Sequence, residues 1–189
     1  MILPILPYGN PILKTKALEI NESYPKLKDL LKNMWETMYS ANGVGLAAPQ
    51  IGLSIRIFII DTFAFSEQEE LSKRESRELA SFKKVFINPK IVEQNGNDWD
   101  FNEGCLSIPD IREDVSRKEL LKISFLDENF VSKTLDLKGI KARVVQHEYD
   151  HIEGILFTDH LSSFKKRILK NKLKNISKGE IKTDYLMKF

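Results

Sequence analysis

The sequence predicts one α+β domain covering residues 1–189, in which antiparallel or mixed β-sheets surround a central helix and a further helix lies near each end of the chain. Three observations lead to this prediction. A length of 189 residues, with 42% hydrophobic and 30% charged positions, suits a single globular domain. Segments with helical periodicity and segments with strand-like alternation both occur. Neither an internal repeat nor a linker divides the chain.

The first regular segment is an amphipathic helix near the N-terminus. Pro25 suits its first turn, and the Asn-Gly pair at 42–43 ends it. Two strands are predicted next: 55–61 is a β-branched run, and 84–92 is similar, although Pro89 implies an edge or a bulge. The apolar positions of the helix recur three and four residues apart, at Leu27, Leu30, Leu31, Met34 and Met38.

The middle of the chain changes character three times. Residues 66–84 are polar with charges of both signs, which predicts a solvated loop or a short surface helix. Residues 120–127 and 131–137 alternate apolar and polar positions, which predicts an antiparallel hairpin. After Gly139 the period becomes helical, and this stretch is the predicted central helix, marked by Ala142, Val145, Tyr149 and Ile152.

The C-terminal tail, residues 161–189, is strongly basic. Nine Lys and Arg against two acidic residues give it a charge of +7, although the whole chain carries only +2. Ile168, Leu169, Leu173 and Ile176 form a helical apolar stripe within it. The tail is therefore predicted to be a basic C-terminal helix, which either packs one face on the domain or also meets an RNA surface.

Several classes of protein are excluded by the composition. A net charge of +2 gives no general attraction to DNA or to anionic lipid. The single cysteine, Cys105, cannot form an internal disulfide, which fits a reducing compartment. No window approaches the roughly 18 to 20 apolar residues of a membrane span, and residues 1–6 lack the pattern of a leader. A cytoplasmic protein is expected.

The sharpest chemical signal is the run from His147 to His151, which reads HEYDH. Residues four apart share one face of a helix, so both imidazoles can bind one metal ion. Glu148, next to the first histidine, can then reach a water on that ion. These are the parts of a metal-dependent hydrolase.

A catalytic site of this kind needs a third protein ligand and an open position for water. Phe157 stands where one zincin subfamily has its third histidine, and neither Glu153 nor Glu180 has the spacing of the usual downstream glutamate. Cys105, in the strand-like segment EGCLS, is the remaining candidate. One thiolate and two imidazoles would complete the ligand set.

A third segment, GVGLAAPQ at 43–50, follows the first helix. Its glycines and alanines permit close passage of a substrate backbone, and the amide of Gln50 can donate a hydrogen bond. The segment lacks the lysine and the hydroxyl of a phosphate-binding loop.

Together and in this order, GVGLAAPQ, EGCLS and QHEYDH resemble the three motifs of the peptide deformylases, and the opening YGNPIL at 8–13 resembles that family too. These enzymes are metal-dependent amidases that remove the formyl group from the initiator methionine of new proteins. The resemblance implies that Cys105, His147 and His151 bind the metal. It further implies that Glu148 is the general base that later protonates the leaving amine, and that Gln50 and the backbone amide of Leu106 stabilise the oxyanion.

The resemblance also implies how the substrate binds. The formylmethionyl peptide would lie as an extended strand between the first two motifs, paired with the backbone of Val44 and Gly45, with Glu103 and Gly104 also at the substrate site. Behind the site, Asp150 would pair with Arg117 and orient the metal helix. The methionine side chain would enter an apolar pocket lined by Val44, Phe101, Val144 and His147.

Two departures from the family pattern concern the cleft and its surroundings. Residues 66–84 are longer than the corresponding connection in shorter members. Arg143 occupies a position that is apolar in some relatives, and its stem is expected to pack while its head reaches solvent. The basic tail resembles a C-terminal helix that in some relatives docks on the ribosome.

The resemblance favours Fe(2+) as the ion, and a mixed N and S site also accepts Zn(2+), Ni(2+) or Co(2+).

Two other functions remain open at this point. A zinc endopeptidase would share the helix motif, but it would be expected to lack a cysteine ligand. A structural-metal module with an RNA-binding tail would want a fourth protein ligand. The only other histidine, His160, falls beyond the helix, and nothing in the sequence brings it to the ion.

Overall fold

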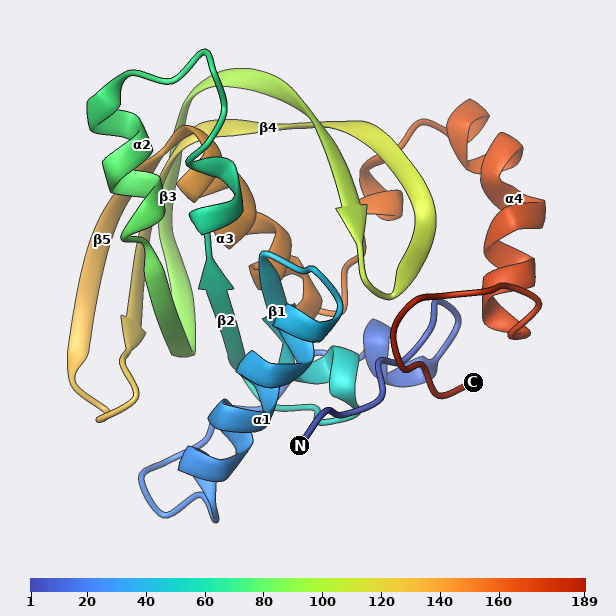
Figure 1. Ribbon diagram of the computed structural model, residues 1–189, viewed down its shortest axis with the longest axis horizontal. Helices are drawn as coiled ribbons and strands as arrows, with labels where there is room; N and C mark the ends of the chain where they lie inside the picture. Colours follow the sequence, from blue (N-terminus) through green and yellow to red (C-terminus); the bar gives the residue numbers. More distant parts are fainter.

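A computed structural model describes residues 1–189 and shows one sheet with helices on both faces (Figure 1). The predicted α+β class is confirmed. The strands are β1 Gly45–Ala47, β2 Ile57–Asp61, β3 Lys83–Cys105, β4 Ile108–Leu126 and β5 Ser132–Lys138. The α-helices are α1 Leu27–Ser40, α2 Lys73–Ala80, α3 Gly139–Ile152 and α4 Ser163–Ser177. Short 3-10 helices lie at Pro11–Lys14, Ala48–Ile51, Phe63–Phe65 and Phe157–His160. No helix has the length and apolar content needed to cross a membrane.

The five strands follow the order β1-β2-β3-β4-β5, and every neighbouring pair is antiparallel. β3 and β4 are much longer than the others and arch from the sheet toward α4 (Figure 1). The register between them shifts between Ile87 and Lys90, so the bulge predicted at Pro89 is confirmed. The predicted hairpin is also confirmed, because β4 pairs with β5 across the turn at 127–131. β1 is a three-residue strand, too short to be recognised from its sequence.

The sheet is covered on both faces, which explains why β2 has no polar face. Phe58 and Ile60 point into a core with α3, whereas Ile57 and Ile59 point into a second core with α1. Stacked rings of Phe58 and Phe86, with centroids 4.7 Å apart, fill the α3 side. The central helix is thus held between the sheet and the distal part of the β3–β4 hairpin.

Of the two outer helices, α1 starts slightly later than predicted, whereas α2 agrees with its prediction. α1 begins at Leu27, and Pro25 lies in the turn before the N-cap Lys26, whose left-handed φ of 54° places the proline outside the first turn. Residues 66–84 contain the short surface helix α2. A capping box between Ser72 and Glu75 begins it, with the Ser72 side chain accepting from the Glu75 amide.

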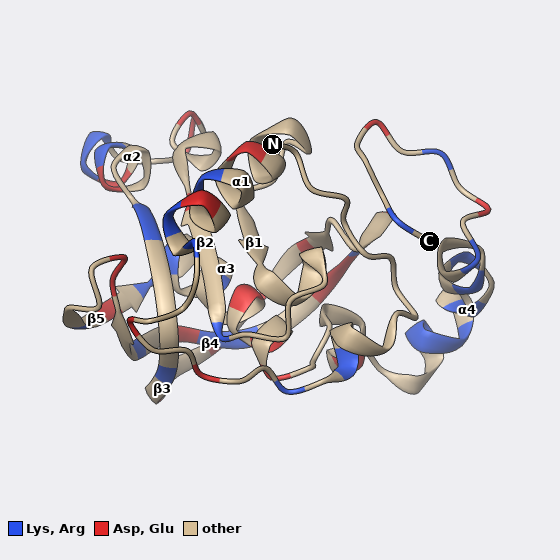
Figure 2. Ribbon diagram, turned by 90° about the horizontal axis from the view of Figure 1, so that it is seen from below, with Lys and Arg blue, Asp and Glu red and all other residues tan.

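The basic tail is helical only in its first half. α4 ends at Ser177, so the helical tail predicted for 161–189 is wrong for 178–189, because Gly179 (φ 74°) turns the chain away. Leu169, Leu173 and Ile176 pack on a third core cluster, but Ile168 is 62% exposed and does not belong to the buried stripe. Figure 2 shows Lys and Arg gathered on α4 at one end of the molecule.

Candidate metal centre and substrate cleft

The metal motif lies on α3, one helical turn of which separates His147 from His151. Their ring centroids are 5.1 Å apart, and both residues are largely shielded from solvent. Cys105 is brought to them by the end of β3, where the register shifts between Gly104 and Cys105. Cys105 Sγ lies 3.3 Å from His151 Nε2, and the three ligand atoms lie within 4.8 Å of one another.

This donor set fits a divalent ion that accepts both nitrogen and sulfur ligands. Burial by itself would raise the pKa of the Cys105 thiol, but the adjacent imidazoles of His151 and His147 outweigh it and lower the pKa to about 5. The thiolate is the form that ligates a metal. The site is therefore supplied with one anionic sulfur and two ring nitrogens.

Glu103 fixes the orientation of His147. Its Oε2 lies 2.9 Å from His147 Nδ1, which leaves the Nε2 of that ring free to ligate. Arg117 donates to the same carboxylate through Nε at 2.7 Å and Nη2 at 3.0 Å. Burial opposes the charge of Glu103, but His147 and Arg117 hold the pKa of this carboxyl well below its usual range. The Glu103 side chain is thus turned toward His147 and Arg117, and only its backbone is left for a substrate.

The predicted Arg117–Asp150 ion pair is present, with Nη1 and Oδ2 2.7 Å apart and both side chains largely buried. His160 Nε2 lies 2.7 Å from the same Asp150 oxygen, so this histidine supports the network and is not among the clustered ligands. Nothing in the sequence indicated that contact, because His160 follows the end of the helix.

Arg143 departs from its prediction. Its side chain is only 2% exposed, so its head does not reach solvent. The guanidinium donates to Glu103 Oε1 at 2.9 Å and to the carbonyl oxygens of Val115, at 2.9 Å, and Trp99. These acceptors all lie on the β3–β4 hairpin, and together they make burial of the charge tolerable. No local pattern could have predicted acceptors 28 to 44 residues away.

Glu148 lies on the side of α3 that faces β1. Its carboxylate packs against Gly45, where a Cβ atom would come within 2.6 Å of Glu148 Cδ. Burial raises the pKa of Glu148 to about 7, and Oε2 has no hydrogen-bond partner in the protein. A buried carboxyl with a pKa near neutrality can both accept and return a proton.

Gln50 faces the same space from the 3-10 helix after β1. Its Oε1 accepts from the Ala47 amide at 2.9 Å, which fixes the amide plane. Its Nε2 lies 3.5 Å from Cys105 Sγ and 3.3 Å from Ser107 Oγ. Its N–H donor therefore points toward the sulfur of the metal centre.

A cleft of about 510 Å³ opens onto this centre. Arg143 borders the cleft, as its position on the metal helix led us to expect, whereas Phe65 and Tyr185 were not predicted among the lining residues, since each reaches the cleft from a distant part of the chain. Phe65 meets Phe101 edge to face, with centroids 6.3 Å apart. The lining includes the predicted residues Val44, Gly45, Phe101, Glu103, Gly104, Leu106 and Val144.

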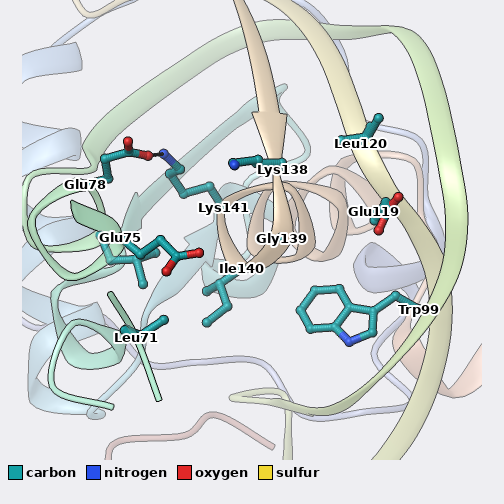
Figure 3. Close-up of a pocket in the computed structure, with 11 residues that line it drawn as sticks. Leu71, Glu75, Glu78, Trp99, Glu119, Leu120, Lys138, Gly139, Ile140 and Lys141 are labelled. Carbon is teal, nitrogen blue, oxygen red and sulfur yellow. Dashed lines mark hydrogen bonds and ion pairs between the residues drawn. The ribbon is translucent and has the colours of Figure 1, made fainter. Parts of the chain in front are cut away.

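A second cavity, of about 530 Å³, lies at the other end of α3, between α2 and β4 (Figure 3). Trp99 and Ile140 face each other across it, and Lys141 Nζ binds Glu78 at 2.8 Å on its rim. It contains neither histidine nor cysteine. The cavity with the chemical groups of a hydrolase is therefore the one at Cys105.

Known proteins with these features share both sequence and fold with this chain. The family model described as polypeptide deformylase matches residues 2–167. Peptide deformylases of Christiangramia forsetii and Flavobacterium johnsoniae are 58% and 57% identical over 189 residues, which is all of this chain and 96% of each relative. The crystal structure of peptide deformylase from Thermus thermophilus has a TM-score of 0.81 at 38% identity, covering 95% of this chain and 99% of that one.

The structure of a peptide deformylase from Legionella pneumophila is similar as well, with a TM-score of 0.80, 33% identity and coverage of 95% and 98%. Neither the endopeptidase nor the structural-metal alternative finds support in these matches. The family is metal-dependent, and the Cys-His-His cluster supplies a site for the metal. The chain belongs to the polypeptide deformylase family, whose members remove the N-formyl group from nascent proteins, and it is an enzyme with that activity.

Proposed function

We propose that Cys105, His147 and His151 hold one divalent ion, Fe(2+) in the native enzyme, and that Glu148, Gln50 and Leu106 perform deformylation beside it. The observation that carries this proposal is the convergence of the three ligand atoms within 4.8 Å, next to a buried carboxyl. Zn(2+), Ni(2+) and Co(2+) suit the same donors. When bound, the ion supplies Lewis acidity, which lowers the pKa of water and polarises a carbonyl oxygen.

Glu148 moves the proton in this scheme. With its pKa raised to about 7, it accepts a proton from the attacking water as the new C–O bond forms. It then returns that proton to the amine nitrogen as the C–N bond breaks. The water is thereby divided between formate and the free methionyl amine, and Glu148 regains its starting state.

Gln50 and Leu106 stabilise the charge that develops on the formyl oxygen. The Gln50 amide is buried and fixed by Ala47, so little reorganisation is needed when charge appears. The Leu106 backbone N–H lies in the turn directly after Cys105. Two fixed donors bind the oxygen more strongly as it becomes negative than they bind the neutral formyl group.

The cleft gives the substrate its orientation. The peptide backbone would pair with Val44 and Gly45, where an extended chain can lie along the edge of the short strand β1. Pairing to main-chain atoms leaves later residues of the peptide loosely specified, as a processor of many proteins requires. The methionine side chain would enter among Val44, Phe101 and Val144, which are apolar and line the cleft.

The test is formate release from a short N-formylmethionyl peptide by anaerobically purified enzyme, with the metal content measured on the same samples. Glu148→Gln keeps the shape of the side chain and is expected to lower kcat by about a hundred- to ten-thousandfold with the metal retained. Glu70→Gln, an exposed loop position, is the matched control and should match wild type. Full activity in metal-loaded Glu148→Gln would refute the assigned role.

We also propose that the enzyme works in the cytoplasm as a single catalytic domain, 1–189, and that α4 docks on the ribosome. The support is that α4 packs its leucines inward and leaves most of its lysines exposed. Binding that depends on contacts with phosphates weakens steeply with salt. Co-sedimentation with ribosomes should therefore fall as salt rises and be lost in Lys170→Glu/Lys174→Glu, whereas salt-insensitive binding would contradict this proposal.

A further inference from the structure

The last residues of the chain, 179–189, form a C-terminal strap that folds back from α4 to the N-terminal segment (Figure 1). The Ile5 amide donates to the Leu186 carbonyl at 2.9 Å, and the Lys188 amide donates to the Ile5 carbonyl at 3.0 Å. Tyr185 and Met187 pack against the core between α1 and the sheet. The strap lies beyond residues 2–167, which the family model matches, so that match assigns it no role.

The strap brings one side chain into the substrate cleft. Tyr185 lines the cleft together with Cys105, Leu106 and Asp110. Its hydroxyl donates a hydrogen bond of 2.7 Å to the Leu106 carbonyl, across 79 residues of sequence. Burial, with the nearby Cys105 and Asp110, raises the pKa of Tyr185, so the hydroxyl keeps its proton and remains a donor.

Leu106 is one of the two residues in the turn that joins β3 to β4. Cys105 pairs with Ile108 across it, so Leu106 and Ser107 form a two-residue loop. Two hydrogen bonds hold Ser107: its carbonyl accepts from the Tyr8 amide at 2.8 Å, and its Oγ accepts from Gln50 Nε2. At Leu106 the carbonyl is held by the Tyr185 hydroxyl. The central peptide of this turn carries the Leu106 carbonyl, so fixing that oxygen restrains the ψ rotation of Leu106, next to its own N–H.

We infer that Tyr185 is a positioning residue for deformylation: its hydroxyl holds the Leu106 carbonyl, restrains the backbone rotation at Leu106, and so keeps the N–H of the adjoining Cys105–Leu106 peptide aimed at the formyl oxygen. The inference rests on the role proposed above for that N–H. A donor that binds charge developing in the transition state contributes to kcat more than to substrate binding. A small displacement of such a donor lowers the rate without unfolding the protein. Tyr185 itself makes no contact with the reacting atoms in this scheme.

The experiment compares Tyr185→Phe, which removes only the hydroxyl, with Tyr24→Phe, a half-buried tyrosine in the loop before α1. Formate release from N-formylmethionyl peptides gives kcat and KM, and metal content and Tm are measured on each sample. We expect kcat of Tyr185→Phe to fall by about three- to thirtyfold, with KM within twofold, and with metal content and Tm equal to wild type. Tyr24→Phe should match wild type throughout.

Each other outcome decides against the inference. A kcat within 1.5-fold of wild type, about the error of such assays, would show that the hydroxyl positions nothing that matters to the rate. A loss of kcat that parallels a loss of metal or of Tm would show a structural role only. An increase confined to KM would place Tyr185 in substrate binding. Inactive, metal-loaded wild type would refute the proposed roles of the site residues, whereas active wild type with an unaffected Tyr185→Phe refutes this inference alone.

Discussion

Replacing Glu103 by Gln should weaken both the fold and the metal site, because one carboxylate accepts hydrogen bonds from two guanidinium groups and from a metal-binding imidazole. It accepts two hydrogen bonds from Arg117, one from Arg143 and one from His147, at 2.7 to 3.0 Å. Glu103 is only 4% exposed, so water cannot replace the lost acceptor. The amide of the glutamine would present two N–H donors toward groups that are themselves donors.

The size of the effect follows from that burial. Removing one partner of a buried ion pair costs about 3–5 kcal/mol, because the remaining charge is left uncompensated. Arg117 still has Asp150 at 2.7 Å, so the lower end, about 3 kcal/mol, applies. Loss of the hydrogen bond that orients a ligating histidine typically lowers metal affinity about 10- to 100-fold. A domain with about 5–15 kcal/mol of stability should still fold.

Urea unfolding followed by tryptophan fluorescence measures the first effect, and competitive titration with a chelator measures the second. Glu113→Gln is the matched control, since Glu113 pairs with Glu103 in the register of β3 and β4 but binds only the partly exposed Lys165, at 2.8 Å. Such surface pairs contribute about 0–1 kcal/mol. A loss below about 1 kcal/mol in Glu103→Gln, with metal affinity within threefold of wild type, would refute the reasoning.

Three further measurements test other parts of the molecule. Gly45→Ala places a Cβ atom within 2.6 Å of Glu148 Cδ, so formate release should fall at least about tenfold while metal content is retained; unchanged kcat would contradict this steric argument. Leu173→Ala, on the buried face of α4, should lower the free energy of unfolding by about 2–5 kcal/mol, whereas an exposed lysine of that helix changed to alanine should cost under about 0.5 kcal/mol. The amide of Val131 lowers the pKa of Asp127 in the folded protein, so the unfolded chain binds the proton first and the stabilisation is lost as pH falls below about 4. Unfolding curves of wild type and Asp127→Asn should therefore converge in acid, and a constant difference between pH 3 and 7 would count against this.

Much of the fold was predictable because its signals are local. The apolar spacing of α1 and α3, the alternation on both sides of the turn at 127–131 and the proline at a bulge each act within a few residues. The extent of β3 was not predictable, because most of its distal half is exposed and shows no apolar alternation. That half is held by pairing with β4 and by contacts with distant side chains of α3. The helical stripe of the tail predicted α4, but Gly179 and the docking of the strap decided where the helix ends.

The sequence by itself determined the chemistry of this protein. Two histidines four residues apart, the glutamate between them and a lone cysteine beside a glycine predict a metal-dependent hydrolase, because helical spacing and ligand type are properties of short segments. Only the tertiary structure decided how those groups are held. Glu103 on His147 and Tyr185 on Leu106 are contacts across 44 and 79 residues of chain, and no local pattern encodes which distant side chain will fill a given space.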